Sequence, residues 1–202
     1  MTGVFAHWPN RITALRFVGA LVLFALLAVW GDGRAEVGPG LATQVCFWLF
    51  VLIALTDYLD GYLARRHGLV SAFGRIADPF VDKVLVLGTM IFLAVMPWSR
   101  PWFPAWIVVV VLAREFLVTG IRGYVEATGA EFPADGFGKV KMVVQCFAIG
   151  FVFGRVAFPW EALGIPLELL SFCTHALVWA TLAASVGSGA TYVLKARALL
   201  AP

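Results

Sequence analysis

The stretch LTDYLDGYLARRHGLVSAFGRIADPFVDK at residues 55–83 places four aspartates, three arginines and a lysine inside a chain that is 61% hydrophobic. Asp57 and Asp60 are three residues apart, and Asp78 and Asp82 are four apart. Because residues at these spacings share one face of a helix, each pair is predicted to project from a single helix face. With a short connection at about residues 66–73, we expect an antiparallel helix hairpin whose four carboxylates face one another.

The chain is much more apolar than a soluble globular protein. Only 13% of its 202 residues are charged, against about 25% in soluble domains, and its mean hydropathy is +0.90. A helix that crosses a membrane needs roughly 20 apolar residues. We therefore predict an all-α polytopic membrane protein that forms a single domain over residues 1–202. Its six transmembrane helices are expected at residues 12–30, 41–63, 76–96, 102–124, 140–158 and 167–194.

The positions of Lys and Arg predict the orientation in the membrane. Six spans put both termini on one side, and every Lys or Arg except Arg34, Arg100 and Arg155 falls toward that side. Since loops rich in Lys and Arg stay in the cytoplasm, we expect an inner-membrane protein whose termini and aspartate hairpin are cytoplasmic. The chain has no long basic run and no basic stripe with interleaved aromatics, so nucleic acid is not an expected partner.

Four clustered carboxylates need a compensating charge near hydrocarbon. An acidic side chain costs about 2.5–3.5 kcal/mol at the bilayer centre. Two hard divalent cations that share bridging aspartate oxygens would supply the charge. Salt bridges to the arginines and the lysine of the same stretch are the alternative. Gly61, Ala64 and Gly74 lie beside the aspartates, and such small residues let a ligand approach closely, which favours the metal site.

The charged and small residues of this stretch also form a motif. They read D-x2-D-G-x2-A-R-x8-G-x3-D-x3-D, which resembles the signature of the CDP-alcohol phosphatidyltransferase family at every fixed position. The resemblance implies a six-span enzyme that acts on a CDP-linked lipid: an alcohol attacks the lipid-side phosphorus and CMP leaves. It also implies that two Mg²⁺ or Mn²⁺ ions hold the diphosphate.

The resemblance assigns a role to each position of the motif. The aspartates are expected to bind the metal ions, and Asp82 is also the candidate general base. The other positions are expected to shape the CDP-lipid pocket. Family members often form homodimers, so a second copy of the chain is an expected partner alongside membrane lipid. The metal ligands are Asp57, Asp60, Asp78 and Asp82, and the lipid-pocket residues are Gly61, Ala64, Arg65 and Gly74.

Two other stretches bear on the alcohol that accepts the phosphatidyl group. PNRITALR at 9–16, and REFLVTGIRGYVEATG at 114–129 followed by GKVKM at 138–142, resemble the branch of the family that uses glycerol 3-phosphate, although Met142 replaces a Thr of that branch. The phosphate of this acceptor is a small dianion, which Arg and Lys bind well. The predicted reaction transfers the phosphatidyl group of CDP-diacylglycerol to sn-glycerol 3-phosphate and releases CMP. The expected acceptor ligands are Arg114, Arg122, Lys139 and Lys141.

Other functions stay open on the sequence alone. The same chemistry could use phosphatidylglycerol (as a cardiolipin synthase does), inositol phosphate or serine as the acceptor. A function of another class is a transporter or channel with a metal-gated carboxylate site. Charges deep in several spans would favour a channel, whereas most of the charges here crowd one side of the membrane. That distribution favours an enzyme that works on a cytosolic substrate.

Several single residues carry weaker expectations. Asn10 or Thr13 is expected to cap the first helix, and Arg16 to reach a substrate phosphate. Arg114 and Glu115 lie together within an apolar run, so we expect them to pair.

Two further features concern the helices themselves. Pro79 predicts a kink or a late helix start near the second aspartate pair. Residues 143–202 carry no motif to which a function can be assigned.

Overall fold

The structure is a computed structural model that describes residues 8–30, 40–67, 72–129 and 136–200. Over these residues the chain forms six α-helices, one short 3-10 helix and no strand. The predicted all-α fold with six helices is therefore confirmed, and each helix begins within a few residues of its expected position. The elements are α1 (Trp8–Trp30), α2 (Leu41–His67), α3 (Ala72–Val95), α4 (Ala105–Ala127), α5 (Gly136–Ala157), η2 (Trp160–Leu163) and α6 (Leu167–Leu200).

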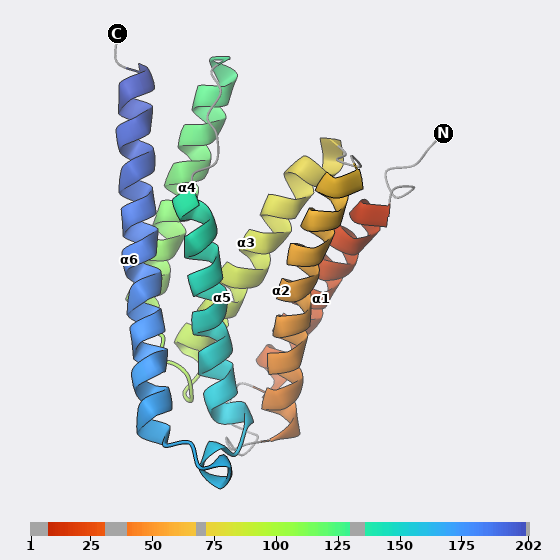
Figure 1. Cartoon of the computed structure of the whole chain (residues 1–202), viewed down its shortest axis with the longest axis vertical. Helices are drawn as coiled ribbons and strands as arrows, with labels where there is room; N and C mark the ends of the chain where they lie inside the picture. The colour runs from red at the N-terminus through yellow and green to blue at the C-terminus, as the bar shows by residue number, and fades with distance from the viewer. Residues whose placement is uncertain (1–7, 31–39, 68–71, 130–135, 201–202) are drawn as a thin grey trace.

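The helices form two groups that meet where α5 packs on α2 and where α3 packs on α4. α1, α2 and α3 lie together, as do α4, α5 and α6, and α5 packs against both α2 and α6 (Figure 1). The first turn of α1 and the last turns of α6 lie at the same end of the molecule (Figure 1). The apolar core lies where the helices meet, and side chains from five of them are almost wholly buried in it: Leu23, Phe50, Met90, Val111 and Phe153.

The outer surface is strongly apolar, as expected for a protein in lipid. Large hydrophobic side chains point outward on α1, α2, α4, α5 and α6, which is unusual for a protein surrounded by water. Three helices are long and apolar enough to cross a membrane, namely Asn10–Trp30, Gly136–Ala157 and Leu167–Arg197. α3 and α4 carry charged side chains within their apolar runs, so the six-span topology stays a prediction. Examples of the exposed residues are Leu15, Leu52, Val109, Phe147 and Phe172.

Local details differ from three expectations. α3 begins at Ala72 and contains Pro79, so Pro79 does not delay the start of the helix, and the alternative of a kink there stays a prediction. α1 begins at Trp8, which puts Asn10 and Thr13 inside the helix, where both are buried, rather than at its N-cap. Over the part of the chain that the structure describes, α2 and α3 both pack on α1 more extensively than on each other. α1 therefore takes part in bringing the two aspartate helices together, which the hairpin prediction did not include.

A glycine sets how closely α1 and α3 approach. A Cβ atom added at Gly88 of α3 would overlap the ring of Phe24 on α1. The Phe24 ring is itself held by stacking on Phe92, with 5.6 Å between the ring centroids. The missing side chain at Gly88 therefore fixes the spacing of the two helices that carry the polar residues described below.

Gly88→Ala should lower the stability of the protein. The added methyl group forces the Phe24 ring or the helix to shift, and overpacking of this kind costs about 1–3 kcal/mol. The apparent Tm in detergent, followed by tryptophan fluorescence, should fall by about 2–10 °C. Gly150→Ala is the matched control, because a Cβ atom there would meet nothing within 4 Å. Equal melting temperatures for the two variants would contradict the packing argument.

Candidate functional site

A buried arginine joins the two aspartate-bearing helices. Arg16 of α1 is 2% exposed, and its NH1 atom lies 2.7 Å from Oδ1 of Asp57 on α2. Its NH2 atom donates a hydrogen bond to Oδ1 of Asp82 on α3. Two carboxylates from different helices therefore share one cation, and three helices converge at this point.

A second polar contact lies one turn away on the same helices. The hydroxyl of Thr13 donates to Oδ1 of Asp78 over 2.5 Å. Thr13 and Arg16 are three residues apart on α1, while Asp78 and Asp82 are four apart on α3, so each pair lies on one helix face. The two contacts make a polar seam between α1 and α3.

The predicted metal ligands are brought together in part. Asp57 and Asp82 share the Arg16 cation, and Asp78 binds Thr13. Gly74 is buried in the first turns of α3. Within the described part of the chain, no group of three or more Asp, Glu, His or Cys side chains lies close enough to hold a metal ion. The side chains of the other predicted positions on α2 lie outside the described residues: Asp60, Gly61, Ala64 and Arg65.

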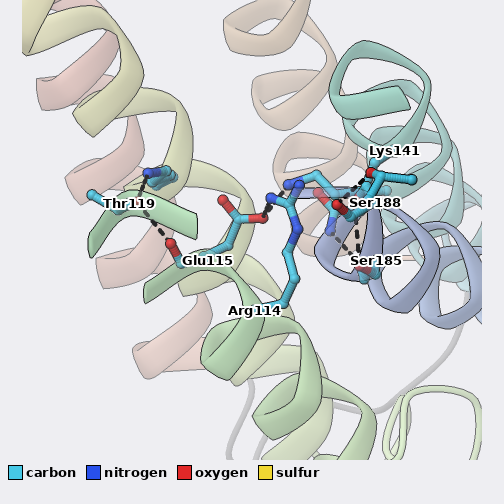
Figure 2. A network of polar contacts seen from close by, with 9 residues as sticks. Arg114, Glu115, Thr119, Lys141, Ser185 and Ser188 are labelled. Carbon is cyan, nitrogen blue, oxygen red and sulfur yellow. Dashed lines mark hydrogen bonds and ion pairs between the residues drawn. The ribbon is translucent and has the colours of Figure 1, made fainter. Parts of the chain in front are cut away.

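A second cluster of buried charges lies between α4 and α5 (Figure 2). Oε1 of Glu115 accepts a hydrogen bond from NH1 of Arg114 over 2.7 Å and a second from Nζ of Lys141. All three side chains are less than 10% exposed. A carboxylate shared by two cations leaves an excess of positive charge in a buried place, and such a place favours an anion.

Hydrogen bonds tie this cluster to α3. Nζ of Lys83 donates to the Thr119 hydroxyl over 2.6 Å, and that hydroxyl donates to the main-chain oxygen of Glu115 over 2.7 Å. Lys83 directly follows Asp82 in the sequence. The chain of contacts therefore fixes α4 relative to the helix that carries the second aspartate pair.

A cavity of about 260 Å³ lies between the two clusters. Its wall includes Asp82 from the Arg16 cluster and the side chains of the Glu115 cluster. Four cationic side chains line it against two carboxylates. Nε of Arg114 is buried and has no hydrogen-bond acceptor among the described residues, so an N–H donor is available for a ligand. Nε of Arg122 lies 3.9 Å from Oε1 of Glu126. The charged lining residues are Asp82, Lys83, Arg114, Glu115, Arg122 and Lys141.

The structure brings most of the predicted ligands of the acceptor phosphate together around the cavity. Arg114, Arg122 and Lys141 line the cavity, whereas the side chain of Lys139 lies outside the described residues. The expected pairing of Arg114 with Glu115 is confirmed. Arg16 contacts aspartates, although the sequence suggested contact with a substrate phosphate.

Other residues of the site were missed by sequence reasoning. The sharing of Glu115 with Lys141 was not foreseen, although an acid inside an apolar run beside a basic residue is a signal that could have indicated it. Gln145 of α5 and Tyr192 of α6 also line the cavity, and no pattern in the sequence indicated either of them.

Comparison with known proteins gives a consistent family match. Residues 6–187 match the model of the CDP-alcohol phosphatidyltransferase family. The CDP-diacylglycerol–glycerol-3-phosphate 3-phosphatidyltransferase of Bacillus subtilis is 34% identical over 192 residues, which cover 93% of each chain. The protein of the same name from Rickettsia bellii is 37% identical over 144 residues, covering 71% of this chain and 73% of its own. A probable phosphatidylglycerophosphate synthase of Mycobacterium tuberculosis H37Rv is 36% identical over 146 residues, covering 72% and 65%.

Arg16→Gln should destabilise the metal-free protein. Removing one partner of a buried ion pair leaves uncompensated charge and costs about 3–5 kcal/mol, and here two carboxylates lose their shared cation. The apparent Tm in detergent with EDTA should fall by on the order of 10 °C. Arg197→Gln, an exposed position on α6, should melt like the wild type. A wild-type melting temperature for Arg16→Gln would show that the ion pairs do not hold the helices.

Proposed function

Because the chain belongs to the CDP-alcohol phosphatidyltransferase family, we propose that it transfers the phosphatidyl group of CDP-diacylglycerol to sn-glycerol 3-phosphate. The products are phosphatidylglycerophosphate and CMP. The observation that carries the proposal is the cationic cavity bounded by Asp82, Arg114, Arg122 and Lys141. Relatives named for this activity cover up to 93% of the chain and support the same reaction.

The charge of the cavity favours this acceptor. Four cationic side chains line the cavity against two carboxylates, and this excess of positive charge suits the dianion of a phosphate monoester. Serine is a zwitterion with no net charge, so its binding would not require an excess of positive charge. Phosphatidylglycerol carries one negative charge and two acyl chains, so it matches the four cationic side chains of this cavity of about 260 Å³ less well. Inositol phosphate is also a monoester dianion, so the experiment below must distinguish it.

The aspartates are the proposed ligands of two Mg²⁺ or Mn²⁺ ions. Carboxylate oxygens are hard ligands that suit these ions, and Asp57 and Asp82 already converge on one cation, Arg16. Asp78 is held at the same seam by Thr13, and Asp60 completes the proposed set from α2. When bound, the ions would neutralise the diphosphate and stabilise the departing CMP.

The side chains of the protein supply the remaining steps. The acceptor phosphate binds Arg114, Arg122, Lys139 and Lys141, and this contact orients the free hydroxyl group. That hydroxyl oxygen forms a bond to the lipid-side phosphorus while the bond from phosphorus to the CMP oxygen breaks. The hydroxyl proton passes to Asp82, which lies in the cavity wall.

The nucleotide and the lipid are proposed to bind beside the aspartates. Gly61, Ala64 and Gly74 leave space for the CDP group next to the helices, and Arg65 pairs with a phosphate of the nucleotide. The acyl chains extend into the membrane, which the exposed apolar side chains of the helices contact.

The cavity is proposed to open to the cytoplasm. Arg122 in the last two turns of α4 and Gly138 in the first turn of α5 both line it. These helix ends lie on the side that carries most of the Lys and Arg residues, which marks the cytoplasmic face. Both termini are assigned to the same side, and a water-soluble acceptor would reach the cavity from there. A homodimer is also proposed, because members of the family often form homodimers.

The acceptor can be tested directly. Purified protein in detergent with CDP-diacylglycerol and Mg²⁺ or Mn²⁺ should release CMP when glycerol 3-phosphate is added. The same mixture with phosphatidylglycerol, inositol phosphate or serine should give background release. Release with one of those acceptors alone would transfer the assignment to that acceptor. An absence of release with every acceptor, in both metals, would favour a transporter or channel.

Asp82→Asn should greatly slow turnover. Asparagine cannot accept the hydroxyl proton and is a poorer metal ligand, so kcat should fall by about 10²–10⁴-fold. The measurement is CMP release at saturating concentrations of both substrates. Glu161→Gln makes the same chemical change at an exposed residue of η2 and should leave kcat unchanged. A kcat near the wild-type value for Asp82→Asn would remove this carboxylate from the mechanism.

A further inference from the structure

The last helix contributes Tyr192 to the wall of the cavity, although its sequence carries no motif of known function. We propose that Gly189 and Tyr192 of α6 are positioning residues that hold the Arg114 guanidinium against the acceptor phosphate. The inference rests on the function proposed above and adds to it a part of the chain that neither the motif nor the cationic stretches include.

Gly189 touches the stem of Arg114. It is buried, and a Cβ atom added there would lie 3.0 Å from Cγ of Arg114. That distance is shorter than an ordinary carbon–carbon contact of about 3.5–4.0 Å. Any side chain at this position would therefore push the Arg114 side chain away from α6. The glycine is needed for space, and its backbone lies within a regular helix.

Tyr192 holds the other end of the same side chain. The central guanidinium carbon of Arg114 lies 5.6 Å from the centroid of the Tyr192 ring, within the range of a cation–π contact. Tyr192 is 4% exposed and lines the cavity one helical turn beyond Gly189. α6 therefore contacts Arg114 at two points along its length.

These contacts leave one edge of the guanidinium for a ligand. NH1 of Arg114 is bound to Glu115, and α6 supports its stem and one face. Nε is buried without an acceptor among the described residues. A fixed guanidinium binds phosphate through directional, charge-assisted hydrogen bonds, so a small displacement weakens the contact. The geometry points to α6 as the element that sets this direction.

A simpler explanation of Gly189 is close packing between α4 and α6, as small residues often provide in membrane helices. Packing alone predicts a loss of stability that is independent of the substrate. A positioning role predicts a change in the KM for the acceptor, and no change in the KM for CDP-diacylglycerol. The two explanations therefore give different kinetic results.

Gly189→Ala and Gly187→Ala form a matched pair for the test. Both add one methyl group to α6 two residues apart, but a Cβ atom at Gly187 would meet nothing within 4 Å. Gly189→Ala should raise the KM for glycerol 3-phosphate about tenfold, because the guanidinium is displaced from the phosphate. Its kcat and its KM for CDP-diacylglycerol should stay at the wild-type values. Gly187→Ala should match the wild type in all three constants.

A double-mutant cycle shows whether the effect passes through Arg114. In an Arg114→Ala background the side chain that Gly189 contacts is absent, so Gly189→Ala should change kcat/KM for glycerol 3-phosphate by less than about twofold. An equal effect in both backgrounds would overturn the inference, as would a Gly189→Ala variant that behaves like Gly187→Ala.

Tyr192→Leu provides the same test if Gly189→Ala does not fold. Loss of the ring removes the cation–π contact, so the KM for glycerol 3-phosphate should rise about fivefold, and the rise should vanish in the Arg114→Ala background. An unchanged KM would overturn the inference. Wild-type protein that releases CMP with another acceptor only would overturn the proposed function and this inference together, whereas an active wild type with unaffected variants would overturn the inference alone.

Discussion

The burial of one cation between two carboxylates is the constraint on which the first half of the molecule depends. An arginine that is 2% exposed in an apolar bundle is stable only when its charge is paired. Asp57 and Asp82 provide that pairing from two different helices, so α1, α2 and α3 have to meet at the depth of Arg16. The glycine at position 88 permits the close approach of α1 and α3 that this meeting requires.

The second cluster inverts the same arrangement. At Arg16 one cation pairs with two carboxylates, whereas at Glu115 one carboxylate pairs with two cations. The first place has excess negative charge and suits cations, while the second has excess positive charge and suits an anion. Asp82 belongs to the first cluster and also lines the cavity of the second. The proposed reaction needs both kinds of place side by side, because a diphosphate held by cations must meet an anionic acceptor.

The sequence predicted more of the fold than of the contacts within the site. Apolar stretches of helical length predicted six helices. The charged motifs indicated Asp82, Arg114, Arg122 and Lys141, which line one cavity. These successes rest on local patterns. The sharing of Arg16 and the part played by α6 depend on how distant helices cross, which residue spacing along one helix does not encode. Thr13 followed three residues later by Arg16 matches the spacing of the aspartates, but only packing shows that the two patterns meet.

The cationic lining of the cavity affects which step limits the rate of the proposed reaction. The phosphate of the acceptor takes no part in bond making, so it carries the same charge before, during and after the transfer. Contacts that are equally strong throughout lower the concentration of acceptor at which the enzyme works, and they do not accelerate the chemical step. The same contacts also retain the headgroup of the newly made lipid. Departure of the product into the bilayer, rather than phosphorus chemistry, is then the step that this cavity would slow.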